Sequence, residues 1–84
     1  MTAAEISTSL ASAIANGRGF CWDAPQHIGN GEVAVYMNSG FGIIARPHPY
    51  AGAGYTVVWG DGTEYDLDST FNNAAAAVRL VETL

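Results

Sequence analysis

The sequence contains no lysine, and its only basic residues are Arg18, Arg46 and Arg79. Eight acidic residues outnumber these three, so the 84-residue chain has a formal net charge of −5. Proteins that bind nucleic acid neutralise its phosphates with basic side chains, and binding to anionic membranes has the same requirement. We therefore expect neither nucleic acid nor a membrane as a direct partner.

Cysteine and long apolar runs are also scarce. The single cysteine, Cys21, cannot form an internal disulfide framework, which favours a reducing compartment, and we expect the cytoplasm. No run approaches the roughly 18 apolar residues of a membrane-spanning helix. The composition is nevertheless 49% hydrophobic and only 13% charged, which is too apolar for a disordered chain. Its length allows one folded domain, residues 1–84.

The N-terminal segment has the pattern of a helix. Thr2 and Glu5 have the spacing of a capping box, and apolar residues follow at helical intervals. Asn16-Gly17 is a stop signal, and we expect Gly17 to adopt the left-handed conformation that closes a last helical turn. The sequence therefore predicts a helix over residues 3–16.

The C-terminal segment predicts a second helix over residues 69–82, because four consecutive alanines favour helix and permit close packing. Three residues are candidates for its N-cap: Asp68, Ser69 and Thr70. Its apolar side chains recur at helical spacing and define the face expected to be buried: Phe71, Ala74, Ala75, Val78 and Val81.

The middle of the chain alternates between strand patterns and turns rich in glycine. Strands are expected over residues 19–23, 32–37, 41–45, 55–59 and 63–67. Tight turns are expected at 38–40 and 60–62, and a longer loop with two prolines at 46–54. The sequence thus predicts a two-layer α+β domain with an antiparallel sheet of four to five strands, a helix at each end, and at least the C-terminal helix packed across one sheet face.

Four acidic residues lie within eight positions near the C-terminal helix: Asp61, Glu64, Asp66 and Asp68. If residues 63–67 form a strand, Glu64 and Asp66 point to one side about 6.6 Å apart, while Tyr65 and Leu67 face the core. Such a row of negative charge is what a phosphate backbone presents to a basic groove. The alternative is an exposed edge strand that charge protects from aggregation.

Two tyrosines are candidates for exposed interface anchors. Tyr36 is out of phase with its apolar neighbours, and Tyr50 lies in the predicted loop, where Arg46 would be its contact partner at the rim. The Phe41–Ala45 segment has no charge to protect an edge, so a homodimer through an edge strand or an open sheet face is an alternative to a monomer.

No motif indicates catalysis or a cofactor. Cys21, His27 and His48 have no zinc-site spacing, and Asp61-Gly62 is better explained by a hairpin turn than by a calcium loop. We expect no catalytic residues, no metal and no organic cofactor, and thus a protein that is not an enzyme. The alternative is a hydrolase-like or redox activity of Cys21 with a histidine.

In size, acidity and the acids Glu64, Asp66 and Asp68, the chain resembles the small acidic α+β inhibitor proteins of phages and mobile elements, of which anti-CRISPR proteins are the best known. The resemblance implies a non-enzymatic inhibitor that binds a basic, nucleic-acid-binding surface of a larger protein or nucleoprotein. The residues expected at that interface are Asp61, Glu64, Asp66, Asp68, Tyr36, Tyr50 and Arg46. Two alternatives are a structural component of a phage or bacterial complex and an immunity-type protein that neutralises a basic toxin.

Overall fold

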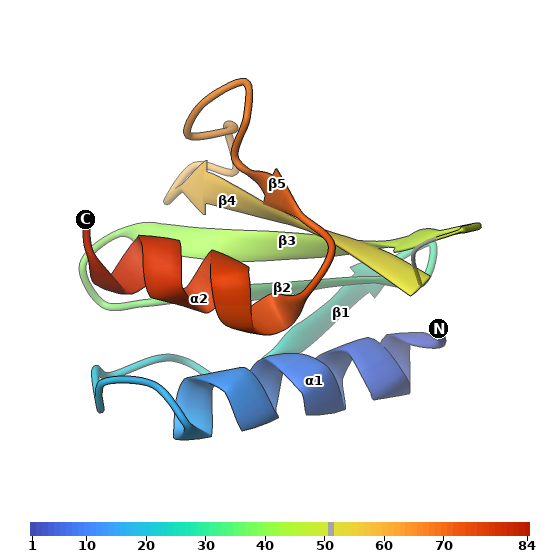
Figure 1. The fold of residues 1–84 in the computed structure, drawn as a ribbon, viewed down its shortest axis with the longest axis horizontal. Helices are drawn as coiled ribbons and strands as arrows, with labels where there is room; N and C mark the ends of the chain where they lie inside the picture. The colour runs from blue at the N-terminus through green and yellow to red at the C-terminus, as the bar shows by residue number, and fades with distance from the viewer. Residues whose placement is uncertain (51) are drawn as a thin grey trace.

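A computed structural model describes residues 1–50 and 52–84 and has the predicted α+β architecture (Figure 1). The elements follow in the order α1 (Ala3–Ala15), β1 (Gln26–Gly29), β2 (Glu32–Tyr36), β3 (Phe41–His48), β4 (Gly52–Trp59), β5 (Thr70–Phe71) and α2 (Ala74–Glu82). The five strands form one antiparallel sheet in the order β1-β2-β3-β4-β5. Within the described ranges, no helix has the length and apolarity needed to cross a membrane.

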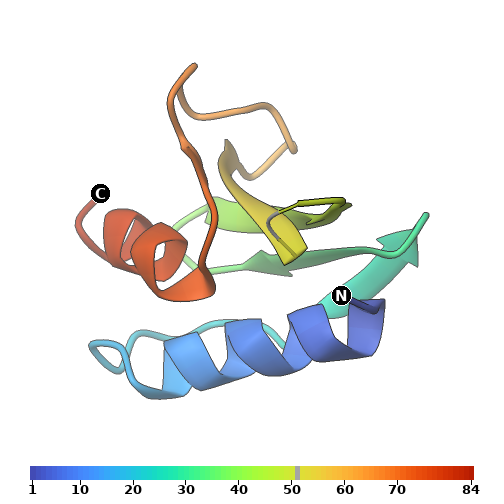
Figure 2. The ribbon, with the colours of Figure 1, turned by 45° about the vertical axis from the view of Figure 1, so that its right-hand side comes forward.

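Both helices pack on the same face of the sheet (Figure 2). The main core lies between these two layers, and its fully buried side chains include Ile6 and Leu10 of α1 and Val78 and Val81 of α2. From the sheet it takes alternate residues, Val33, Val35, Ile43, Ala45, Ala53, Tyr55 and Val57. The opposite face of the sheet has neither helix over it.

The start of α1 confirms the predicted capping box. The Thr2 amide donates to Glu5 Oε1 at 2.9 Å, and the Glu5 amide donates to Thr2 Oγ1 at 3.2 Å. The predicted left-handed conformation of Gly17 is wrong. The glycine instead makes room for the buried Glu82 carboxylate, whose Oε2 is 2.6 Å from the position a Cβ would take.

The predicted start of the C-terminal helix is wrong by several residues. The N-cap is Asn73, whose side chain accepts a hydrogen bond from the Ala76 amide at 2.8 Å. None of Asp68, Ser69 and Thr70 caps the helix, because the chain first pairs with β4 to form β5. Phe71 therefore belongs to β5, and Ala75 is exposed, whereas Ala77 joins the buried face.

The first predicted strand, at residues 19–23, is reduced to a single bridge between Trp22 and Met37. The sheet begins instead at β1, which is joined to β2 by the turn at Asn30-Gly31, where both residues have positive φ (56° and 73°). This geometry suits the two-residue turns of β-hairpins, and it places a strand directly before the turn.

The predicted loop at residues 46–54 is wrong, because β3 extends to His48 and β4 begins at Gly52. Pro47 is tolerated there because it lies beyond Ala45, the last β3 residue that pairs with β2, so its missing N–H removes no bond to that strand. The strand order makes β3 the central strand of the sheet. The proposed unprotected edge at Phe41–Ala45 is therefore also wrong, since the edges are β1 and β5.

Candidate functional site

The sheet face opposite the helices is the candidate site, and we call it the open face. Strand alternation and register place on it Glu32, Ala34 and Tyr36 of β2, Gly42, Ile44 and Arg46 of β3, and Gly54, Thr56 and Val58 of β4. Ala34, Ile44 and Val58 form a small second apolar cluster there, with Tyr36 packed against it. These three residues are buried, so the apolar centre of the open face is already shielded from solvent.

Tyr36 covers the middle of the open face. It is the cross-strand partner of Gly42, and a Cβ on that glycine would collide with the Tyr36 ring and lie 2.6 Å from the Val35 carbonyl oxygen. The Tyr36 hydroxyl is 3.9 Å from the position of a Cβ on Gly62, in the turn after β4. The predicted placement of Tyr36 opposite the core residues Val33 and Val35 is confirmed, and its side chain is half-buried.

Two acidic residues, Asp23 and Glu64, lie on the same side of the sheet as this tyrosine. Glu64 bridges Val58 and therefore shares its face, and the Asp23 amide donates to the Tyr36 carbonyl oxygen at 2.9 Å. Arg46 is the basic side chain that the register places on the face, and its Nε lies 3.6 Å from Glu32 Oε2. Because this ion pair neutralises Arg46, Asp23 and Glu64 leave the open face with a negative field.

The acidic segment 60–69 does not form the predicted strand at residues 63–67. Only Glu64 makes a strand-like bridge, and the chain then rises from the sheet on the side away from α1 (Figures 1 and 2). The evenly spaced row of Glu64, Asp66 and Asp68 is therefore wrong as a geometry, although all three residues are exposed. Asp61 lies in the predicted turn at 60–62, where its carboxylate accepts the Thr63 amide at 2.9 Å, and this bond lowers its pKa.

Two side chains attach this segment to the sheet. Tyr65 packs against the rings of Phe41 and Trp59, with centroids 5.8 and 5.4 Å away. The hydroxyl of the buried Ser69 lies 3.3 Å from the Val57 carbonyl oxygen of β4, and the Ser69 carbonyl oxygen accepts the Val57 amide at 2.9 Å. These contacts fix both sides of the tip of the segment.

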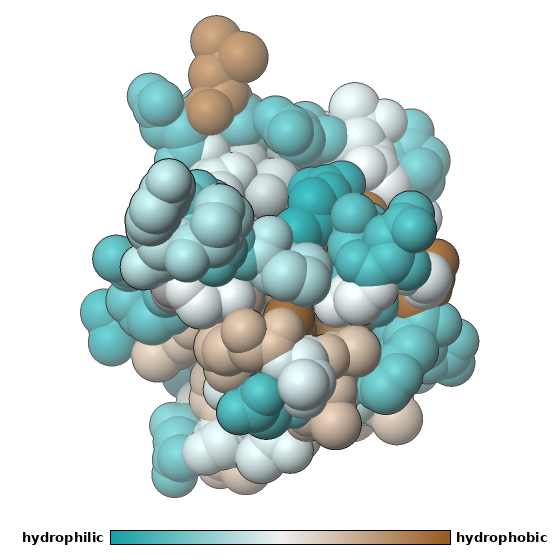
Figure 3. All heavy atoms as spheres, turned by 90° about the vertical axis from the view of Figure 1, so that its right-hand side faces the viewer, coloured by the Kyte–Doolittle hydropathy of each residue, from teal (hydrophilic) through white to brown (hydrophobic). Residues whose placement is uncertain are grey.

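The tip carries a residue that sequence reasoning misplaced. Leu67, expected to face the core, is 91% exposed, and its amide donates to Asp66 Oδ1 at 2.7 Å. Figure 3 shows a hydrophobic side chain standing clear of the upper end of the molecule, at the height of this segment, above a largely hydrophilic surface.

Tyr50 lies far from Tyr36. It is 94% exposed and follows the end of β3, and its amide donates to His48 Nδ1 at 3.2 Å. The six steps from Gly42 to His48 span about 20 Å of extended strand. The structure thus brings Tyr36, Glu64 and the turn containing Asp61 together and leaves Tyr50 at the other end of the sheet.

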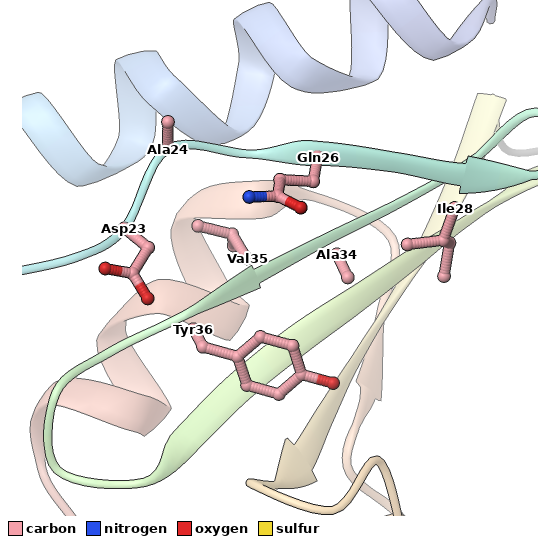
Figure 4. A pocket seen from close by; sticks show the side chains of 7 residues that line it. All are labelled: Asp23, Ala24, Gln26, Ile28, Ala34, Val35 and Tyr36. Carbon is pink, nitrogen blue, oxygen red and sulfur yellow. The ribbon is translucent and has the colours of Figure 1, made fainter.

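A cavity of about 150 Å³ adjoins Tyr36 on the open face (Figure 4). It is lined by Asp23, Ala24, Gln26, Ile28, Ala34, Val35 and Tyr36. Sequence reasoning missed Gln26 and Ile28 because the strand at 26–29 was not predicted, and it assigned no role to Asp23 at the end of the predicted strand 19–23. The signal that could have found them is Asn30-Gly31, since this dipeptide favours a hairpin with a strand on each side.

The alternative site at Cys21 adjoins a cavity that neither of the two histidines lines. The exposed Cys21 lines a cavity of about 410 Å³ with Phe20, Met37, Asn38, Ser39, Glu82 and Leu84, and neither His27 nor His48 is part of its lining. In the described part of the chain, no group of three or more His, Cys, Asp or Glu residues is arranged to hold a metal ion.

Comparison with known proteins adds no assignment. No protein-family model matches the chain, and neither curated proteins nor solved structures give a match.

Proposed function

We propose that the protein is a non-enzymatic binding domain whose open face engages a basic surface of a larger partner protein. The observation that supports this proposal is the uncovered sheet face on which Arg46 is paired with Glu32, while Asp23 and Glu64 form no ion pair with any of the described residues. A locally negative, preformed face is complementary to a positive surface, and the net charge of −5 accelerates the encounter.

Tyr36 adds contact area to this charge. Its ring lies flat across Gly42, and its phenolic end reaches the turn at Gly62, so apolar and polar groups are presented together. Tyrosines of this kind are enriched in protein interfaces because they bury much area with few rotatable bonds. The apolar cluster beneath is already covered, so binding depends more on charge and the tyrosine than on exposed aliphatic surface.

The specific form of the proposal is an inhibitor that occupies a nucleic-acid-binding surface, as anti-CRISPR-type phage proteins do, in the cytoplasm of the host cell. A surface that binds phosphates carries basic side chains, and the carboxylates of the open face compete for them. An immunity-type protein would use the same carboxylates against a basic toxin, so the identity of the partner distinguishes these two forms.

The experiment starts with immobilised protein and host lysate at low ionic strength, followed by identification of the retained protein by mass spectrometry. The purified partner is then titrated by calorimetry against wild type and Glu64→Gln at several salt concentrations. We expect Glu64→Gln to weaken binding by at least about fivefold, or about 1 kcal/mol, and to reduce the salt dependence.

The matched control is Glu5→Gln. It makes the same change of charge on α1, and glutamine at this position preserves the capping box. If Glu64→Gln and Glu5→Gln lower the affinity for the partner equally, the loss is explained by net charge alone, which contradicts a role for the open face. Failure of the partner's nucleic acid to compete with the protein would contradict inhibition while leaving binding intact.

A further inference from the structure

The cavity beside Tyr36 has the chemistry of a site for one organic cation. Asp23 and Gln26 provide oxygen acceptors, and Ile28 and Ala34 provide apolar walls. Figure 4 shows the Gln26 side chain and the Tyr36 ring on opposite sides, Asp23 towards one end, Ile28 at the other and Ala34 between them. The lining contains no basic residue among those the structure describes, so an anion would meet only the Asp23 charge.

Asp23 is available to a ligand. It is an exposed residue, and within residues 1–50 and 52–84 its carboxylate accepts no hydrogen bond and forms no ion pair. Its backbone is nevertheless fixed, because its amide donates to the Tyr36 carbonyl oxygen at 2.9 Å and the preceding residue, Trp22, bridges Met37. The charge is therefore held beside the cavity without being neutralised by the protein itself.

We infer that this cavity binds the ammonium group of a lysine side chain. An ammonium group has three N–H donors and no acceptor, which matches the Asp23 carboxylate and the Gln26 carbonyl oxygen. The Tyr36 ring is a further wall of the cavity, and the methylenes of lysine pack on it and on Ile28 and Ala34.

The size of the cavity limits what it can hold. Its volume of about 150 Å³ is well below the roughly 300–1,000 Å³ of sites for drug-sized ligands. It therefore takes the end of one side chain. The inference rests on the proposed function, because the basic partner supplies the lysine. It specifies the place on the open face at which one lysine of the partner binds.

The test uses Nα-acetyl-lysine N-methylamide as the probe, titrated into isotope-labelled protein and followed by NMR chemical shifts. We expect the shifts to concentrate on residues 23–28 and 34–36, with a dissociation constant in the millimolar range, on the order of 10 mM. The norleucine analogue has the same carbon chain without the ammonium and should cause no comparable shifts. n-Butylammonium should bind too, and binding of this small amine without the lysine probe would contradict a lysine site.

Variants distinguish binding in the cavity from general electrostatic attraction to the acidic protein. Asp23→Asn should lower the affinity for the lysine probe by at least about fivefold. Glu64→Gln removes the same charge outside the cavity and should change this affinity by less than about twofold. Tyr36→Leu should also bind the probe more weakly, because the Tyr36 ring is one wall of the cavity. Among the described residues the Asp23 carboxylate makes no hydrogen bond and no ion pair, so Asp23→Asn should fold normally.

Absence of shifts with the lysine probe, equal shifts with the norleucine analogue, or unchanged binding in Asp23→Asn would each overturn the inference. Because the probe experiment needs no partner, a negative result removes the lysine site and leaves the proposed binding function to its own test. If the lysine probe binds but Glu64→Gln does not weaken binding of the partner protein, the lysine site is supported and the role of the wider acidic face is contradicted.

Discussion

The ring of Tyr36 lies across Gly42, its cross-strand partner, in the space where any other residue would carry a side chain. The open face owes its flat centre to this pair, because a bulkier residue at position 42 would lift the ring from Ala34, Ile44 and Val58. Aromatic side chains that cover a glycine on a neighbouring strand help to fix strand register.

Gly42→Ala should destabilise the protein by about 1–3 kcal/mol, since the added methyl collides with the ring and the backbone cannot move freely in a central strand. The control is Gly54→Ala, where a Cβ would meet only Thr70 Cγ2 at an ordinary 3.6 Å. Urea denaturation of both variants measures the difference. A similar small change in both would show that Tyr36 moves aside without cost.

Gly17 and Glu82 make a second close pair, between the end of α1 and the end of α2. A Cβ at Gly17 would lie 2.6 Å from Glu82 Oε2, the oxygen that accepts the Arg18 amide at 3.0 Å. Gly17→Ala should therefore displace the buried carboxylate and cost about 1.5–3 kcal/mol, the worth of a hydrogen bond to a charged group.

A double-mutant cycle gives the control for this pair. In the Glu82→Ala background, Gly17→Ala no longer meets a carboxylate, and we expect its cost to fall by at least about 1 kcal/mol. Additive free energies of unfolding in the cycle would contradict the proposed conflict between the two side chains.

We expect the protein to lose stability in acid, because two carboxyl groups have a lowered pKa in the folded state. The pKa of Glu5 is lowered from its ordinary 4.5 because the carboxylate accepts the Thr2 amide. The pKa of Asp61 is lowered from 3.8 because its carboxylate accepts the Thr63 amide. A folded-state pKa below the unfolded one means that the stabilisation is complete above these ordinary values and disappears as pH falls through the lowered ones.

Carboxyl NMR titration should place both groups below their ordinary pKa, and denaturation midpoints should decrease over the same acidic range. Glu5→Gln preserves the capping box and removes the titrating group, so its stability should depend less on pH than that of wild type. An unchanged pH dependence in this variant would assign the acid sensitivity to other residues.

Ser69 is the hydrogen-bonding residue that holds the acidic segment 60–69. Its hydroxyl donates to the Asp66 carbonyl oxygen and accepts the Asp66 amide at 3.3 Å, and the residue is only 1% exposed. Ser69→Ala should cost about 1–2 kcal/mol and accelerate hydrogen exchange of the Asp66 amide. Ser39→Ala, in an exposed turn, is the control and should change neither quantity.

The parts of the fold that sequence predicted correctly depend on local chemistry. The capping box at Thr2 and Glu5 and the turn at 60–62 involve residues no more than a few positions apart, so the sequence contains the whole interaction. The two helices, the antiparallel sheet and the placement of Tyr36 follow from periodicity. These features needed no information about distant contacts.

The wrong predictions concern segments whose conformation depends on contacts with residues far away in the sequence. Residues 63–67 alternate like a strand. In the structure, however, Tyr65 packs against the rings of Phe41 and Trp59. The hydroxyl of the buried Ser69 binds the Asp66 carbonyl oxygen, and the chain turns so that Leu67 is exposed to solvent. The cavity depends on β1 pairing with β2, which aligns Gln26 with Ala34, and nothing in the weak strand pattern of residues 26–29 indicates that alignment.

The order of the strands has a consequence for how the chain folds. Each strand pairs with its neighbour in sequence, and β3 and β4 share the longest ladder, from Phe41↔Trp59 to His48↔Gly52, with three residues of sequence between the two strands. Such nearby pairings cost little loop-closure entropy, whereas the contact of α1 with α2 joins the two ends of the chain. We therefore expect the β3–β4 hairpin to form in the folding transition state and α1 to dock after it. Destabilising changes in α1 should then accelerate unfolding and leave the refolding rate almost unchanged.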